Sequence, residues 1–111
     1  MTEKENNNNA PKVQWLENLV NYQDGSVVSR EIIRKSTGTV TLFASDEGHG
    51  LSEHTAPFDA LVYIVEGEAE VFISGKAYHM NQDEFVILPA NKPHALHALS
   101  KFKMLLVMIK S

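Results

Sequence analysis

Two histidines, His54 and His94, are the residues of this chain whose surroundings best suit chemistry. His54 stands in SEHTAPFDALVYIVEGE and His94 in ILPANKPHALHA, so each lies beside a proline and a long apolar run. Turn-forming pairs at residues 66–67, 74–75 and 82–83 allow an antiparallel meander that folds both imidazoles toward one cavity. Imidazoles placed in this way can bind a divalent metal ion, hold a small molecule or transfer protons near neutral pH.

Composition narrows the classes of function. The 111 residues suffice for one domain with one core. Ten Lys and Arg against fourteen Asp and Glu give a formal net charge of -4 with no basic stripe, so no nucleic-acid partner is expected. The chain has no cysteine, so we expect any metal to use His, Asp or Glu ligands. Because no apolar run is long enough to span a bilayer and the start carries no targeting pattern, we expect a cytoplasmic protein without a membrane partner.

The chain divides into a short polar tail and one β-rich domain. Residues 1–11 include four consecutive asparagines and predict a disordered tail, which leaves 12–111 as a single domain. Short apolar pieces separated by glycine and proline turns predict an all-β fold. Within it, residues 68–73 alternate, with Ala69, Val71 and Ile73 on the buried face. Only residues 12–23 have helix-like spacing.

Two of the predicted strands are apolar on nearly both faces. They are residues 61–65 and 102–109, the latter reading FKMLLVMI. A strand of this kind needs cover on two sides, and in so small a chain the second cover can come from a partner subunit. We therefore predict a homodimer. Trp15 is predicted to be a packing anchor, in one interpretation at the subunit interface.

Two segments of the chain resemble the signature motifs of the cupin superfamily. Residues 48–67, GHGLSEHTAPFDALVYIVEG, follow the first motif, G-x5-H-x-H-x3-4-E-x6-G. Residues 83–98, DEFVILPANKPHALHA, follow the second, G-x5-P-x-G-x2-H-x3-N. The matching positions are Gly48, His54, Gly67, Pro89 and His94, whereas Asp83, Asn91 and Ala98 replace two glycines and an asparagine of the second motif.

The resemblance implies an all-β fold, a double-stranded β-barrel of the jelly-roll type with six to eleven strands. It covers the chain from about Ser26 to the end. The strings HTAPFDAL and LPANKPHAL, followed by FKMLLVMI, are further similar to small single-domain bacterial cupins of undefined activity.

The chain departs from the family at two metal ligands. Metal-bearing cupins use the second His and the Glu of the first motif, and these places hold Ala56 and Ala60. With only His54 and His94 left, we expect at most a weakly bound divalent ion such as Fe, Mn, Ni or Zn. His49, in a loop between two glycines, is the candidate third ligand. Three other polar residues are expected to point elsewhere, namely Glu53, His79 and His97.

The two alanines also predict a particular kind of pocket. If Ala56 and Ala60 line the barrel together with Val62 and Ile64, the space near the histidines is wide and apolar. Such a pocket suits a small, partly apolar ligand held by a few polar groups.

Three classes of function therefore stay open. The first is a small-molecule-binding cupin with a degenerate metal site, which fits the alanines best. The second is an enzyme, either a metal-dependent dioxygenase or decarboxylase that uses His54, His94 and a recruited ligand, or a metal-free isomerase. The third is a dimeric structural or interaction module whose pocket is vestigial.

Overall fold

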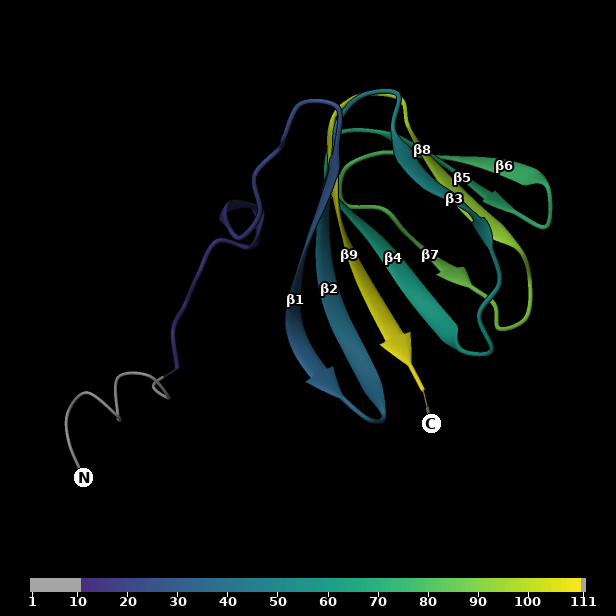
Figure 1. The fold of residues 1–111 in the computed structure, drawn as a ribbon, viewed down its shortest axis with the longest axis horizontal. Helices are drawn as coiled ribbons and strands as arrows, with labels where there is room; N and C mark the ends of the chain where they lie inside the picture. The colour runs from purple at the N-terminus through teal and green to yellow at the C-terminus, as the bar shows by residue number, and fades with distance from the viewer. Residues whose placement is uncertain (1–10, 111) are drawn as a thin grey trace.

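The protein is a sandwich of two antiparallel sheets, seen in a computed structural model that describes residues 11–110 (Figure 1). The five-stranded sheet has the order β1 (Val27–Lys35), β2 (Gly38–Ser45), β9 (Phe102–Ile109), β4 (Asp59–Glu66) and β7 (Phe85–Leu88). The four-stranded sheet has the order β3 (Gly50–His54), β8 (His94–Ala98), β5 (Ala69–Ile73) and β6 (Lys76–Met80). These nine strands confirm the predicted all-β jelly roll with six to eleven strands.

The core lies between the two sheets and is built by alternation along their strands. Val62 and Ile64 of β4 face Ala69 and Val71 of β5, and all four side chains are fully buried. The alternation predicted for residues 68–73 is therefore confirmed. Because every second residue of each strand points inward, the side chains of the two sheets together fill the space between them.

The segment before β1 covers part of the outer face of the five-stranded sheet. Of residues 12–23, only Leu16–Asn18 form a helix, a single 3-10 turn (η1), so the possible helix over this range is not formed. Val20 is buried against Leu42 and Ala44 of β2. Trp15 is 73% exposed, so it is not a packing anchor within residues 11–110.

A polar cluster fixes this segment to the sheet. Lys103 of β9 is only 7% exposed, and its Nζ donates a hydrogen bond to the carbonyl of Glu17 over 2.5 Å. The same Nζ lies 4.0 Å from the carboxylate of Glu66 and 5.0 Å from the ring centre of Tyr22. The Tyr22 hydroxyl donates to Glu66 over 2.6 Å, and burial, followed by this carboxylate, raises the pKa of Tyr22. A buried lysine is tolerable here because its charge has a carboxylate, a carbonyl and a ring around it.

Backbone conformations explain the departures in the second motif. Asp83 and Asn91, which stand where the motif has glycine, have φ values of +70° and +64°. Asn and Asp are the non-glycine residues that adopt this left-handed region most readily. Gly67 of the first motif has φ +83°, and a Cβ there would lie 2.1 Å from the carbonyl oxygen of Lys101. The chain therefore has left-handed backbone conformations at these three motif positions, although only one of them is glycine.

Two predictions concern the ends and the surroundings of the chain. Residues 1–10 of the predicted tail lie outside the described residues. Among residues 11–110, no helix has the length and apolarity that crossing a membrane would require.

Candidate functional site

The two predicted histidines meet where β3 ends and β8 begins. The strands pair in register at His54 and His94, after an irregularity between Leu51 and His54 that shifts the end of β3. The two Nε2 atoms are 3.0 Å apart, and the rings meet edge to face with their centres 4.3 Å apart. His94 is 7% exposed whereas His54 is exposed, so the pair joins the barrel interior to its surface.

Each ring is also anchored through its other nitrogen. Nδ1 of His54 lies 2.8 Å from the carbonyl oxygen of Ser52, and Nδ1 of His94 lies 3.3 Å from that of Lys92. A carbonyl only accepts, so each Nδ1 needs a proton to make its contact. The contact between the rings needs a third proton.

Two neutral imidazoles carry only two N–H groups for these three contacts. In the neutral pair the two shorter contacts take them: His54 donates from Nδ1 to Ser52, and His94 donates from Nε2 to His54. The Nδ1 of His94 then faces the carbonyl of Lys92 without a proton.

Burial sets the charge state of the inner ring. It lowers the pKa of His94, and the neighbouring His54 lowers it further, whereas the carbonyl of Lys92 acts in the opposite direction. His94 is therefore neutral at pH 7, and its single proton can move from Nε2 to Nδ1 when a ligand takes over the contact at Nε2.

A cavity of about 30 Å³ lies beneath the pair. Apart from the two histidines its lining is apolar, consisting of Leu51, Ala56, Phe58, Ala60, Leu88, Leu96, Met104, Leu106 and Met108. Ala56 and Ala60 line this cavity together with His54 and His94. Val62 and Ile64 do not, because they lie deeper in the barrel, in the packed core.

The structure does not bring the other predicted polar residues to the pair. His49 hydrogen-bonds through its carbonyl to the amide of Ala98, at the opposite end of β8 from His94, so it cannot act as the third ligand. At about 3.3 Å per residue, the four residue steps from His94 to Ala98 separate the two ends of β8 by roughly 13 Å. His97 is exposed, and its neighbours along β8, Leu96 and Ala98, are buried.

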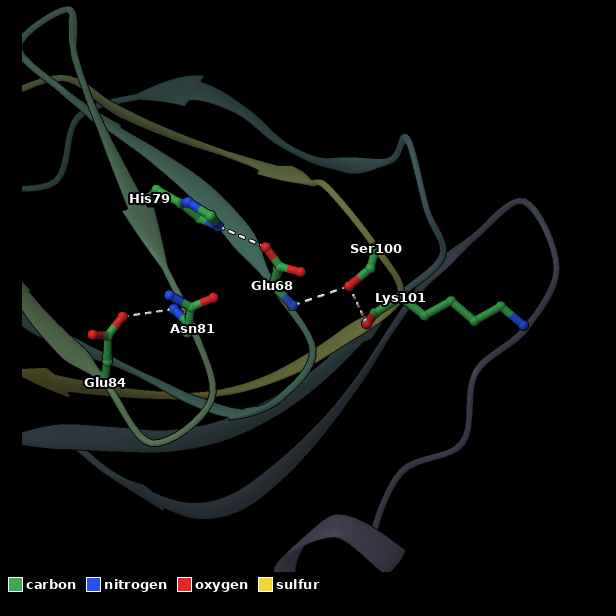
Figure 2. A network of polar contacts seen from close by, with 6 residues as sticks. All are labelled: Glu68, His79, Asn81, Glu84, Ser100 and Lys101. Atoms are coloured by element: carbon green, nitrogen blue, oxygen red, sulfur yellow. Dashed lines mark hydrogen bonds and ion pairs between the residues drawn. The ribbon is translucent and has the colours of Figure 1, made fainter.

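His79 belongs to a different polar network, on the outer surface of the four-stranded sheet. Its Nε2 lies 2.7 Å from the carboxylate of Glu68, and the backbone amide of Glu68 donates a hydrogen bond to the hydroxyl of Ser100 over 3.0 Å (Figure 2). Both the His79 and the Glu68 side chains are about half exposed.

The donor set does not fit the four-ligand metal site that the resemblance implies. In residues 11–110 no three His, Asp or Glu side chains are grouped so that they could hold a metal ion. Catalytic zinc sites use three protein ligands, and here only two imidazoles converge. No step through a divalent metal follows from this geometry.

Comparison with known families matches residues 36–110 to the Cupin domain. The chain belongs to the cupin family. Among solved structures, a conserved protein of unknown function from Streptococcus pyogenes is 34% identical, with a TM-score of 0.86 over 90% of this chain and 88% of that one. A Cupin 2 conserved barrel domain protein from Leptotrichia buccalis is 37% identical, with a TM-score of 0.82. The match covers 85% of this chain but 46% of the Leptotrichia protein, so the present chain spans about half of that length.

A third cupin shares the fold at lower identity. This cupin superfamily protein from Desulfitobacterium hafniense is 22% identical, with a TM-score of 0.84 over 92% of this chain and 93% of that one. A comparison with curated proteins gave no match. The relatives establish the family and the barrel, and the chemistry of this cupin has to come from its own pocket.

One feature of the pocket escaped the sequence analysis. Met108 lines the cavity, and β9 pairs it with Ala60, the residue at the family's Glu position. The sequence does contain a pattern that could have indicated this. Phe102, Met104, Leu106 and Met108 alternate along FKMLLVMI and therefore lie on one face of the strand.

Proposed function

We propose that this cupin binds a small, mostly apolar molecule through the His54–His94 pair, without the family's four-ligand metal. The observation that supports this most is the 3.0 Å contact between the two Nε2 atoms above a cavity whose remaining lining is apolar. Binding sites combine such a lining with a few convergent polar groups that fix the orientation of the ligand.

The hydrogen-bond donor and acceptor that the two rings offer determine which polar group of a ligand fits them. In the neutral pair, His94 offers an N–H and His54 offers a lone pair at the same point. A hydroxyl can accept from the first and donate to the second, so it can replace the direct contact without loss of hydrogen bonds. A carboxylate can only accept, and in the neutral pair it would leave the lone pair of His54 without a donor.

The size of the cavity limits the ligand. At about 30 Å³ the enclosed space is far below the roughly 300 Å³ of pockets for drug-sized molecules. A ligand of a few heavy atoms fits if it extends toward the mouth, where His54 is exposed. We therefore infer a small neutral alcohol as the ligand class, with affinity in the millimolar range for about five heavy atoms.

The test uses isobutanol and isobutyrate, which differ only in the polar group. We expect isobutanol to shift the ring 15N resonances of His54 and His94 at pH 7.5, and isobutyrate to act more weakly. His94→Ala should abolish the effect, and His97→Ala, on the outer surface, should leave it unchanged. Equal shifts in the His94→Ala protein, or none with either compound in the parent, would contradict the proposal.

We also propose that the chain forms a homodimer through the outer face of its five-stranded sheet. Phe85, Ile87 and Ile109 on this face are 61%, 47% and 52% exposed. Acidic and basic residues lie on opposite sides of this patch, with Arg30 and Lys35 on β1 and Asp59 and Asp83 at β4 and before β7. A two-fold axis along the strands would place β1 of one copy over β7 of the other, which brings opposite charges together.

Sedimentation of the full chain at about 50 μM tests the dimer. Ile87→Asp should produce a monomer, because it buries a charge in the proposed interface. Leu99→Asp is the matched control, since Leu99 is 40% exposed but lies in the loop before β9, away from this face. A monomeric parent, or a monomer produced equally by both variants, would overturn the proposal.

A further inference from the structure

The cavity beneath the histidine pair holds sulfur as well as nitrogen donors. Met104 and Met108 of β9 both line it, together with His54 and His94. A thioether is a soft ligand that favours Cu(I) over divalent ions of the harder type, and imidazole also binds copper well. With no cysteine among the 111 residues, methionine is the softest ligand that the chain can offer.

Of the two methionines, Met108 lies at the level of the histidines. It pairs with Ala60, which in turn pairs with Leu88 at the end of β7. The loop that follows, residues 89–93, hydrogen-bonds to the turn before β4: the amide of Asn91 donates to the carbonyl of Ala56 over 2.7 Å. His94 comes directly after this loop, so the register brings Met108 and His94 to the same end of the barrel.

Met104 lies deeper. It pairs with Ile64, four residues further along β4 than Ala60. At about 3.3 Å per residue, its Cα is roughly 13 Å along the strand from that of Met108. Both residues line the cavity, and the strand register places Met108, not Met104, at the end of the barrel that carries His54 and His94.

The charge of the pocket discriminates between ions. No Asp or Glu is among the described residues that line the cavity, so a bound ion would keep its full charge in apolar surroundings. The solvation cost of an ion scales with the square of its charge, so a monovalent ion costs roughly a quarter as much as a divalent one of the same size. Replacement of the family's Glu by Ala60 therefore disfavours divalent ions and does little against monovalent ones.

A bound cation would also allow both neutral rings to donate a hydrogen bond from Nδ1. With a metal ion on both Nε2 atoms, each neutral ring keeps its proton on Nδ1, and both carbonyl contacts are satisfied. Two nitrogens that bind one ion at about 2.0 Å and 120° are about 3.5 Å apart. The observed separation is 3.0 Å, and the exposed ring of His54 can open by the remaining distance.

We propose that His54, His94 and Met108 form a binding site for a soft monovalent cation of the Cu(I) class. The inference goes beyond the proposed function, because the site needs no organic ligand and either proposal can fail alone. Ag(I) is the appropriate probe, since it has the same charge and softness and undergoes no redox change in air.

The experiment titrates the tag-free full chain with Ag(I) in chloride-free buffer, by calorimetry and by NMR of 13C-methyl-labelled methionine. One equivalent should bind, and the methyl resonance of Met108 should shift while that of buried Met80 stays. Met108→Leu and His94→Ala should each weaken binding at least tenfold, and Met104→Leu, the matched control in the same cavity, should bind as the parent does. Zn(II) should bind at least tenfold more weakly than Ag(I).

Several results would overturn the proposal. They are an unchanged affinity in Met108→Leu, an equal loss in Met104→Leu, or Zn(II) binding as tight as that of Ag(I). Leu and Met have similar volumes, so these variants should fold, which their amide NMR spectra will show. If Met108→Leu nevertheless fails to fold, the methyl shift in the parent decides: a static Met108 resonance at one equivalent of Ag(I) refutes the site.

Discussion

Restoring the two missing family ligands should convert this pocket into a divalent metal site. The change is Ala56→His together with Ala60→Glu, at two positions that line the cavity beside His54 and His94. Ala60 is almost fully buried between Leu88 and Met108, and the cavity of about 30 Å³ cannot take a Glu side chain without displacement. We therefore expect the metal-free variant to be less stable than the parent by about 1–3 kcal/mol.

Metal should reverse this loss. Free Zn(II) or Mn(II) at 100 times its Kd stabilises the folded variant by about 2.7 kcal/mol. For a domain of this size that corresponds to a rise in Tm of roughly 10 °C. The parent, with two imidazoles and no carboxylate, should shift by less than about 2 °C at the same metal concentration.

Thermal unfolding of four proteins measures the effect: the parent, the double variant, and each of them with His94→Ala. The metal-dependent rise should occur in the double variant alone. If the double variant gains no more than the parent, the side chains at 56 and 60 do not converge on the pair, and the cavity geometry described above is wrong. A large rise in the parent would reveal a ligand that the two histidines do not account for.

Three further predictions concern stability. The pKa of His94 is lowered in the folded protein, so between that pKa and about 6.5 the unfolded chain binds a proton that the folded protein does not. The free energy of unfolding should therefore rise with pH through this window and then level off. His94→Gln should lose this part of the pH dependence in urea titrations. Asn91→Ala should destabilise by about 1 kcal/mol, because alanine resists φ +64°, and Asn91→Gly should not; a loss of equal size in both would place the effect in the side chain. Lys103→Met should cost about 1–3 kcal/mol, and its effect should not add to that of Tyr22→Phe, since both residues contact Glu66; strict additivity in a double-mutant cycle would refute the coupling.

The parts of the fold that depend on local chemistry could be predicted from the sequence. The alternation of residues 68–73 predicts β5 and its buried face, and the motif positions predict that His54 and His94 share one end of the barrel. The left-handed turns at Asp83 and Asn91 also follow from residue type once the motif register is set.

The rest depends on packing over long sequence distances, which periodicity does not report. Residues 12–23 have helix-like spacing, yet Val20 is buried by the outer face of the sheet and Lys103 fixes the segment in a mostly extended form. His49 looks close to the pair in the sequence, but strand pairing carries it to the Ala98 end of β8. The approach of Met108 to Ala60 needs the register between β4 and β9, which the two segments do not reveal separately.

The positions of the core and of the histidine pair explain how this cupin can keep its barrel with an altered site. The fully buried residues Val62, Ile64 and Val71 do not line the cavity, so part of the apolar core is independent of it, whereas Ala60 belongs both to the core and to the cavity lining. His54 and Ala56 lie at the mouth, where they are less buried than the core. We therefore expect substitutions at His54 and Ala56 to change the proposed ligand binding more than the folding free energy, and substitutions at Ala60 to change both.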